Sequence, residues 1–158
     1  MAANVHGRRD AVTNAGTDRT PAQWYDLVVG AVLLLVGIVG FFVNSSFATG
    51  DAAGGHGDDL IIFHVNGWHN VVHVLSGVFL LAMAGAPARA RIGAITFGVI
   101  YGVVTLWGLI DGNDVLGLVA IDGADNVLHI VLTLSALAAG FAPRSQVDVR
   151  RDAAATPR

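Results

Sequence analysis

Apolar residues run through the chain in four long stretches, and polar residues collect between them. The stretches are 27–43, 71–86, 92–110 and 126–142. A helix needs ~20 largely apolar residues to cross a bilayer, with ~17 as a lower bound. The first and third stretches reach this length alone, whereas the second has 16 residues and the fourth has 16 after Asn126, so that both reach it only with the polar residues at their openings. The pattern predicts four transmembrane helices, two of which begin with polar side chains in the membrane or at its surface.

The second and fourth stretches open on the same polar element, 56 positions apart. It reads Asn-Gly-Trp-His-Asn-Val-Val-His at 66–73 and Asp-Gly-Ala-Asp-Asn-Val-Leu-His at 122–129. Both copies run in the same direction across the predicted membrane, which indicates two similar helical hairpins related by an axis along the membrane normal. The alternative is chance similarity between two junctions that both need a helix cap and a glycine. The expected fold class is therefore all-α, a polytopic membrane protein with four transmembrane helices in two hairpins, a parallel internal repeat.

The arginines predict the orientation of these helices. All nine cations of the chain are arginines; three precede the first stretch, two lie between the second and third, and four follow the fourth. The two remaining loops, around 51–64 and 111–122, contain none. The positive-inside rule therefore places both termini and the 86–91 turn in the cytoplasm. We expect a multi-pass protein of the inner (cytoplasmic) membrane, with the other two loops outside.

Composition agrees with a membrane protein and narrows its chemistry. The 158-residue chain is 54% hydrophobic and only 13% charged, with a mean hydropathy of +0.62, so the lipid bilayer is its expected partner. Residues 24–142 form the predicted transmembrane domain, between cytoplasmic tails at 1–23 and 143–158 that are expected to be disordered. The absence of cysteine excludes disulfides and thiolate metal sites. No nucleotide-binding loop, hydrolase elbow or basic surface for nucleic acid is present, and catalysis is not favoured.

Each polar element begins with a residue suited to cap a helix. The side-chain oxygens of Asn66 and Asp122 can accept from backbone N–H groups that have no helical partner. Positions four and seven residues past each cap share its helix face. They are Asn70, His73, Asn126 and His129. The two histidines lie ~10 Å beyond the helix starts, where capping does not account for them.

The candidate polar site consists of His69, Asn70, His73, Asp125, Asn126 and His129. Three interpretations of it stay open. The favoured one is structural: the side chains hydrogen-bond between the second and fourth helices near the extracytoplasmic face, where lipid provides no hydrophobic drive. It requires no cofactor. In this interpretation the carboxylate of Asp125 orients the ring of His129, four residues further along the helix.

The second interpretation is a site for a metal or for haem. Imidazoles on two facing helices can hold either group. His73 and His129 could be axial ligands of a haem, or could bind zinc, copper or iron together with His69 and Asp125. The third is a pocket for a small ligand or for protons, with Asp125 and His129 as the titrating pair. Against a proton relay, no charged residue is expected in the inner half of any helix.

Small residues on the third helix indicate a helix contact. Gly98 and Gly102 lie one turn apart and allow another helix to approach closely. A homo-oligomer or another membrane protein is therefore a further expected partner.

The two polar elements together resemble a known family. Residues 65–77 and 122–129 are similar to the paired N-x-x-H-N-x-x-H and N-G-x-D-N-x-x-H signatures of domain of unknown function 4383, a family of small bacterial membrane proteins common in actinobacteria. The resemblance covers about 24–142, and Gly98 falls in the family's third helix. Asp122 departs from the expected asparagine, which keeps the capping role and adds a charge. The resemblance implies four transmembrane helices and no established activity.

Overall fold

The computed structural model describes residues 19–112 and 114–143. These residues form four α-helices: α2 (Pro21–Val43), α3 (Gly67–Met83), α4 (Pro87–Asp111) and α5 (Gly123–Phe141). The predicted all-α fold with four helices is confirmed. By length and composition α2, α4 and α5 can cross a membrane, whereas α3, with 17 residues, is shorter. Of the predicted tails, 1–18 and 144–158 lie outside the described residues.

The first helix begins six residues before the apolar stretch because the local sequence caps it. The Thr20 side chain accepts from the Gln23 backbone N–H, and the Gln23 side chain accepts from that of Thr20. This reciprocal pair, with Pro21 at the first helical position, stabilises the helix start. Because α2 begins before the apolar stretch, it also contains Asp26, which is fully buried. Asp26 lies near the end of the bundle opposite the hairpins, and if that end is cytoplasmic, as the arginines predict, it is an ionisable residue in the inner half of a helix.

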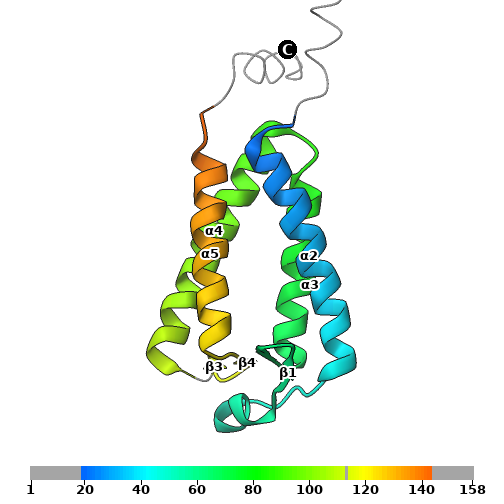
Figure 1. Ribbon diagram of the computed structural model, residues 1–158, viewed down its shortest axis with the longest axis vertical. Helices are drawn as coiled ribbons and strands as arrows, with labels where there is room; N and C mark the ends of the chain where they lie inside the picture. The colour runs from blue at the N-terminus through cyan, green and yellow to red at the C-terminus, as the bar shows by residue number, and fades with distance from the viewer. Residues whose placement is uncertain (1–18, 113, 144–158) are drawn as a thin grey trace, which may run out of the picture.

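The helices pack as two pairs, α2 along α3 and α4 along α5 (Figure 1). Glycine permits the close approach within each pair. A Cβ added at Gly30 would lie 3.0 Å from the Cβ of Leu80, and one added at Gly98 would lie 2.9 Å from the Cγ of Leu137. Gly98 thus contacts α5 of the same chain. The two pairs share a core whose buried members are Leu33, Leu80, Phe97, Tyr101 and Ala136.

The two loops at one end of the bundle fold into short antiparallel hairpins (Figure 1). The strands are β1 (Asp58–Leu60), β2 (Phe63–Val65), β3 (Asp114–Val115) and β4 (Val119–Ala120). In β1–β2, Asp58 pairs with Val65, and in β3–β4, Asp114 pairs with Ala120. Two single-turn 3-10 helices, Gly50–Ala52 and Gly54–His56, precede β1. The N-terminal end of α2 and the C-terminal end of α5 lie at the opposite end of the bundle (Figure 1).

Candidate functional site

Three buried histidines converge at the hairpin end of the helices. His69 and His73 belong to the first half of α3, and His129 lies on α5. Nitrogens of the three rings, one from each, lie within 4.8 Å of one another. The exposed fractions of the three residues are 1%, 5% and 3%, so bulk water does not reach the rings freely.

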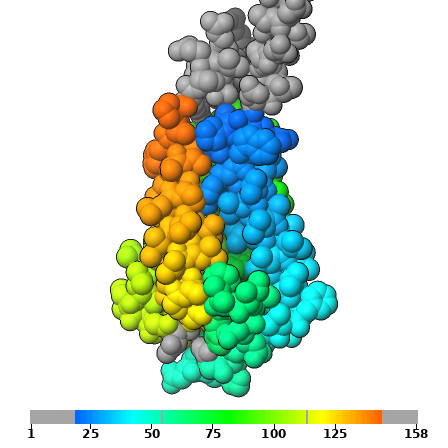
Figure 2. All heavy atoms as spheres, in the orientation of Figure 1, coloured from blue at the N-terminus to red at the C-terminus, as the bar shows by residue number. Residues whose placement is uncertain are grey.

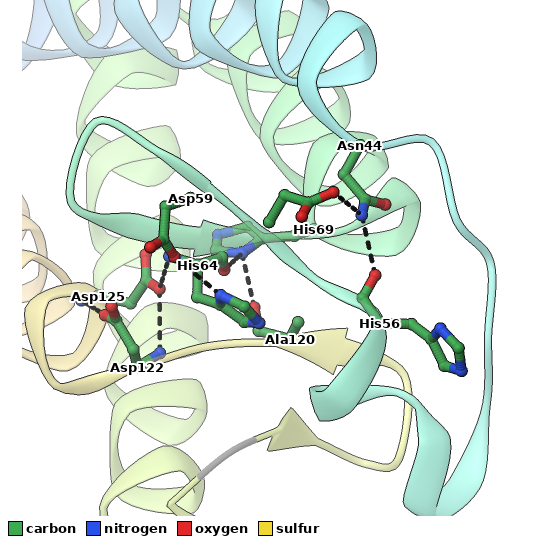
Figure 3. A network of polar contacts seen from close by, with 9 residues as sticks. Asn44, His56, Asp59, His64, His69, Ala120, Asp122 and Asp125 are labelled. Atoms are coloured by element: carbon green, nitrogen blue, oxygen red, sulfur yellow. Dashed lines mark hydrogen bonds and ion pairs between the residues drawn. The ribbon is translucent and has the colours of Figure 1, made fainter.

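Backbone carbonyls hold the ring of His69 in place. Its Nδ1 lies 2.8 Å from the carbonyl oxygen of Ala120 and 3.1 Å from that of His64 (Figure 3). Because a carbonyl oxygen only accepts, Nδ1 carries the proton and donates it. Nε2 of His69 then presents a lone pair, and it lies 3.1 Å from Nε2 of His73.

His73 and His129 each keep a buried nitrogen without a hydrogen-bond partner in the described part of the chain. In both rings this atom is Nδ1. Other rings pack around them: the ring centroids of His69 and His73 are 4.4 Å apart, and those of Tyr101 and His129 are 5.3 Å apart. A buried polar atom left unpaired costs about 1–3 kcal/mol. Such atoms in a native structure call for an explanation, of which an unfilled ligand position is one.

The carboxylate of Asp125 binds backbone groups. Its Oδ2 accepts from the N–H of His64 at 3.1 Å and from the N–H of Asp122 at 3.0 Å (Figure 3). Oδ1 of Asp122 accepts in return from the N–H of Asp125 at 2.8 Å, which completes a capping box at the start of α5. These bonds anchor α5 to β2, while Nδ1 of His129 has no hydrogen-bond partner among residues 19–112 and 114–143.

Asn66 both caps α3 and ties it to the second hairpin. Its Oδ1 accepts from the N–H of His69 at 2.9 Å, and its Nδ2 donates to the carbonyl of Leu118 at 2.7 Å. Asn66 is fully buried, so both hydrogen bonds form away from solvent. The cap of α3 is thus also a contact between the two halves of the chain.

Asn70 and Asn126 do not join the histidines; each lies within its own helical pair. Asn70 donates from Nδ2 to the carbonyl of Asn44 at 2.8 Å and packs against Gly40 of α2. Asn126 packs against Gly108 of α4. Of the six candidate residues, the structure brings together His69, His73 and His129, and places the other three around them.

Two further residues contribute to the site without having been assigned from the sequence. His64 on β2 supplies both a carbonyl for His69 and an N–H for Asp125, and its ring Nδ1 lies 3.0 Å from Oδ1 of Asp59. Tyr101 donates its hydroxyl to Ser76 at 3.3 Å and faces the ring of His129. The signal available for Tyr101 was a lone tyrosine in the middle of an apolar helix. His64 acts through its backbone, which leaves no trace in the residue type.

A cavity of about 290 Å³ adjoins the histidines between α2 and α5. Its lining is apolar except at one end, where His73 and Asp125 reach it. The β1–β2 hairpin contributes Leu60, Ile61 and Phe63 to the same cavity.

Long apolar helices, a bundle with both described ends on one side, and a buried histidine cluster define the class: a small all-α protein whose helices suit a lipid bilayer. The chain belongs to the family described as Domain of unknown function (DUF4383), whose model matches residues 23–142. The family resemblance of the two polar elements is thereby confirmed. No curated protein and no solved structure matches the chain.

Proposed function

We propose that the protein binds a transition-metal ion between His69, His73 and His129. The observation that supports this proposal is the convergence of three buried imidazoles from two helices, with one nitrogen of each within 4.8 Å of the others. Neutral imidazole is a common ligand of zinc, copper, nickel and iron. We propose zinc as the reference ion for testing.

The spacing of the rings fits a tetrahedral ion. With Zn–N bonds of ~2.0–2.1 Å, two nitrogens on one ion lie ~3.3 Å apart. The Nε2 atoms of His69 and His73 are 3.1 Å apart. The bond from Nδ1 of His69 to the carbonyl of Ala120 is the outer hydrogen bond that orients metal-bound histidines. Three such ligands would leave a fourth position open for water or another small molecule.

Haem fits this arrangement less well than a single ion. Axial coordination by His73 and His129 would require a flat porphyrin between the two rings. The ring of His69 occupies that region, with its centroid 4.4 Å from that of His73 and 6.1 Å from that of His129. The proposal is therefore a mononuclear metal site.

A structural role is the second candidate, and a specific set of hydrogen bonds favours it. Asn66 binds Leu118, His69 binds Ala120, and the N–H of His64 binds Asp125. These three bonds link the α2–α3 half of the chain to the α4–α5 half without a ligand. This candidate explains His69 but gives no reason for His73 and His129 to converge on it.

We also propose that the site lies on the extracytoplasmic side of the inner membrane, with both termini in the cytoplasm. The placement of the arginines supports this orientation. The common location of the two described chain ends agrees with it (Figure 1).

The parallel repeat is likewise a proposal, supported by matched contacts in the two helical pairs. Gly40 faces Asn70 in one pair and Gly108 faces Asn126 in the other. The separation of the asparagines is that of the two polar elements in the sequence.

We further propose that the protein self-associates through a groove on α4 and α5. This groove on the surface of α4 and α5 includes Gly98, Gly102 and Thr133 among its lining residues, and could receive a helix of a second copy.

The metal proposal is tested on protein purified in mild detergent, stripped with a chelator and titrated with zinc. We expect one zinc per chain, with affinity reduced by about 10- to 100-fold or more in His73→Ala and in His129→Ala. His56→Ala is the matched control, because His56 is exposed and lies outside the cluster. Elemental analysis of unstripped protein and an absorption spectrum identify the native metal and detect haem. Zinc binding that is absent, or unchanged in both variants, would overturn the proposal.

Thermal unfolding separates the metal candidate from the structural one. In metal-free protein, His69→Ala should cost about 1–3 kcal/mol under either candidate, because the buried carbonyl of Ala120 loses its donor. Only the metal candidate predicts that zinc raises the melting temperature of the unmodified protein and not that of His73→Ala. Equal effects of zinc on both proteins would favour the structural candidate.

A further inference from the structure

The cavity beside the histidines is a groove that follows the helices. Its walls are formed by Val28, Val32 and Val36 of α2 and by Leu128 and Leu132 of α5, and Ile61 of the β1–β2 turn contributes to it. The hairpin segment lies between α5 and α2 on the face shown in Figure 2. From Val28 to Val36 the groove extends ~12 Å along the helix axis. That is close to the ~15 Å depth of one leaflet of the hydrocarbon core.

The groove opens toward the lipid phase. Val32 and Ile61, both in its lining, are 53% and 86% exposed. Both α2 and α5 are long and apolar enough to cross a membrane, so the medium beside this opening is hydrocarbon. An apolar cavity of this kind does not hold water, which needs two to four polar partners. A volume of about 290 Å³ is close to the lower limit for small-molecule sites, ~300 Å³.

One end of the groove is polar, whereas the rest of its lining is apolar. His73 and Asp125 lie there, and within the described residues Nδ1 of His73 is buried without a hydrogen-bond partner. An imidazole nitrogen can donate to, or accept from, a neutral oxygen group. Asp125 is 1% exposed, and its carboxylate accepts two backbone N–H groups. A second negative charge beside it would be both desolvated and repelled.

We propose that this groove binds, from the lipid phase, the single apolar chain of a neutral amphiphile whose hydroxyl or carbonyl head hydrogen-bonds to His73. The valines and leucines contact the chain, and Ile61 covers it at the hairpin. A charged head of either sign is excluded. An anion would be repelled by the carboxylate of Asp125, and a cation would lose its hydration beside a carboxylate that already accepts two backbone N–H groups. The lipid site shares His73 with the proposed metal site but uses its other ring nitrogen, Nδ1, and the metal ligand His129 is not among the residues that line the groove.

The test uses a photoreactive C16 alcohol that carries a diazirine in its chain, added to the full-length protein in nanodiscs. After irradiation, mass spectrometry maps the labelled peptides. We expect labelling concentrated on α2 and α5 near Val32 and Leu132. Val32→Trp fills the groove and should reduce labelling at least fivefold. Leu35→Trp is the matched control: Leu35 is 63% exposed on the same helix and outside the groove, so labelling should be unchanged.

Competition tests the head group. Unlabelled hexadecanol should reduce labelling, whereas palmitate and hexadecylamine, with the same chain length and a charged head, should compete at least tenfold more weakly. His73→Leu, which removes both ring nitrogens, should abolish this preference while labelling of the groove persists.

Uniform labelling of all helices, or insensitivity to Val32→Trp, would overturn the lipid site. If palmitate or hexadecylamine competed as strongly as hexadecanol, the proposal that the head group is neutral would be overturned. His129→Ala should lose zinc and retain labelling, so the failure of either site is recognised separately.

Discussion

At the residue scale, each helical pair is built around a glycine that faces an asparagine. Gly40 of α2 lies against the side chain of Asn70, and Gly108 of α4 lies against that of Asn126. In hydrocarbon, helix association depends on close packing and on hydrogen bonds between helices. The missing side chain of glycine leaves the space that the buried amide occupies, so the two residues of each pair depend on one another.

A methyl group at either glycine should therefore weaken the fold. In Gly40→Ala and in Gly108→Ala the added Cβ overlaps Oδ1 of the facing asparagine. Overpacking of this kind typically costs about 1–3 kcal/mol. Denaturant titration of the detergent-solubilised variants measures the loss. Gly123→Ala serves as the control, because a Cβ at this helical position meets no other described atom within 4 Å apart from its chain neighbours and the backbone of its own helix.

A double substitution identifies the cause of that loss. Asn70→Ala removes the side chain that the new methyl group strikes, so Gly40→Ala with Asn70→Ala should be less destabilised than the sum of the two single variants. Simple additivity would mean that the glycine is required for another reason, such as contact with the backbone.

The residue types at the site and their spacing could be predicted from the sequence. The direction in which each side chain points came from the structure. A seven-residue spacing from the caps placed His73 and His129 on definite helix faces, and they do converge with His69. The same reasoning put Asn70 and Asn126 in that cluster, although each turns toward its own helical partner. Helical periodicity relates residues on one helix, and it does not say which neighbour that face meets. Backbone partners such as the carbonyl of Ala120 have no sequence signature at all.

At the element scale, the two hairpins share an unusual backbone conformation. Ile61 follows β1 with a φ of 66°, and Leu116 follows β3 with a φ of 59°. For residues with a Cβ, and above all for β-branched isoleucine, this left-handed region is strained by about 1–2 kcal/mol. Strain of this kind persists where surrounding contacts fix it, often near ligand sites. Ile61 lies at the groove, whereas Leu116 is not among its lining residues.

Substitution by glycine distinguishes the backbone strain of the hairpin from a role of its side chain in lipid binding. Ile61→Gly and Leu116→Gly both relieve the backbone, so each should unfold at a temperature equal to or above that of the unmodified protein in a differential scanning experiment. Only Ile61→Gly removes the side chain over the groove, and it should reduce photolabelling by the C16 alcohol several-fold. Equal labelling of the two variants would show that the hairpin plays no part in lipid binding.

Apolar runs were sufficient to predict the helices, and insufficient for the elements between them. The four apolar stretches became α2 to α5, two of them together with the polar residues that open them, because hydrophobicity and length are properties of each segment alone. The early start of α2 follows from the capping box of Thr20 and Gln23, a local signal that hydropathy does not register. Strands of two or three residues, as in β1 to β4, are too short for an alternating pattern to be visible.

At the scale of the whole molecule, the groove and the histidine cluster arise where the two helical pairs meet. Polar bonds between β4 and α3 join the pairs at the hairpin end, and side chains of the shared core join them further along. The space between α2 and α5 depends on how the pairs are oriented, which no single element specifies. The groove was therefore beyond prediction from periodicity, whereas membership of the family followed from the two polar elements.

The orientation of the protein in the membrane determines from which side a metal ion would reach the histidines. Cysteine labelling can measure this orientation directly. The chain contains no cysteine, so each introduced thiol is the sole target of a maleimide. Asp51, exposed at the hairpin end, and Gly85, exposed in the turn between α3 and α4, are suitable positions. In intact cells, a membrane-impermeant maleimide should label Asp51→Cys and should label Gly85→Cys only after permeabilisation, because the arginines place that turn in the cytoplasm. The opposite pattern would invert the protein and place the histidine cluster next to the cytoplasmic metal pool. Labelling of both variants in intact cells would mean that the four helices do not cross the membrane as two complete hairpins.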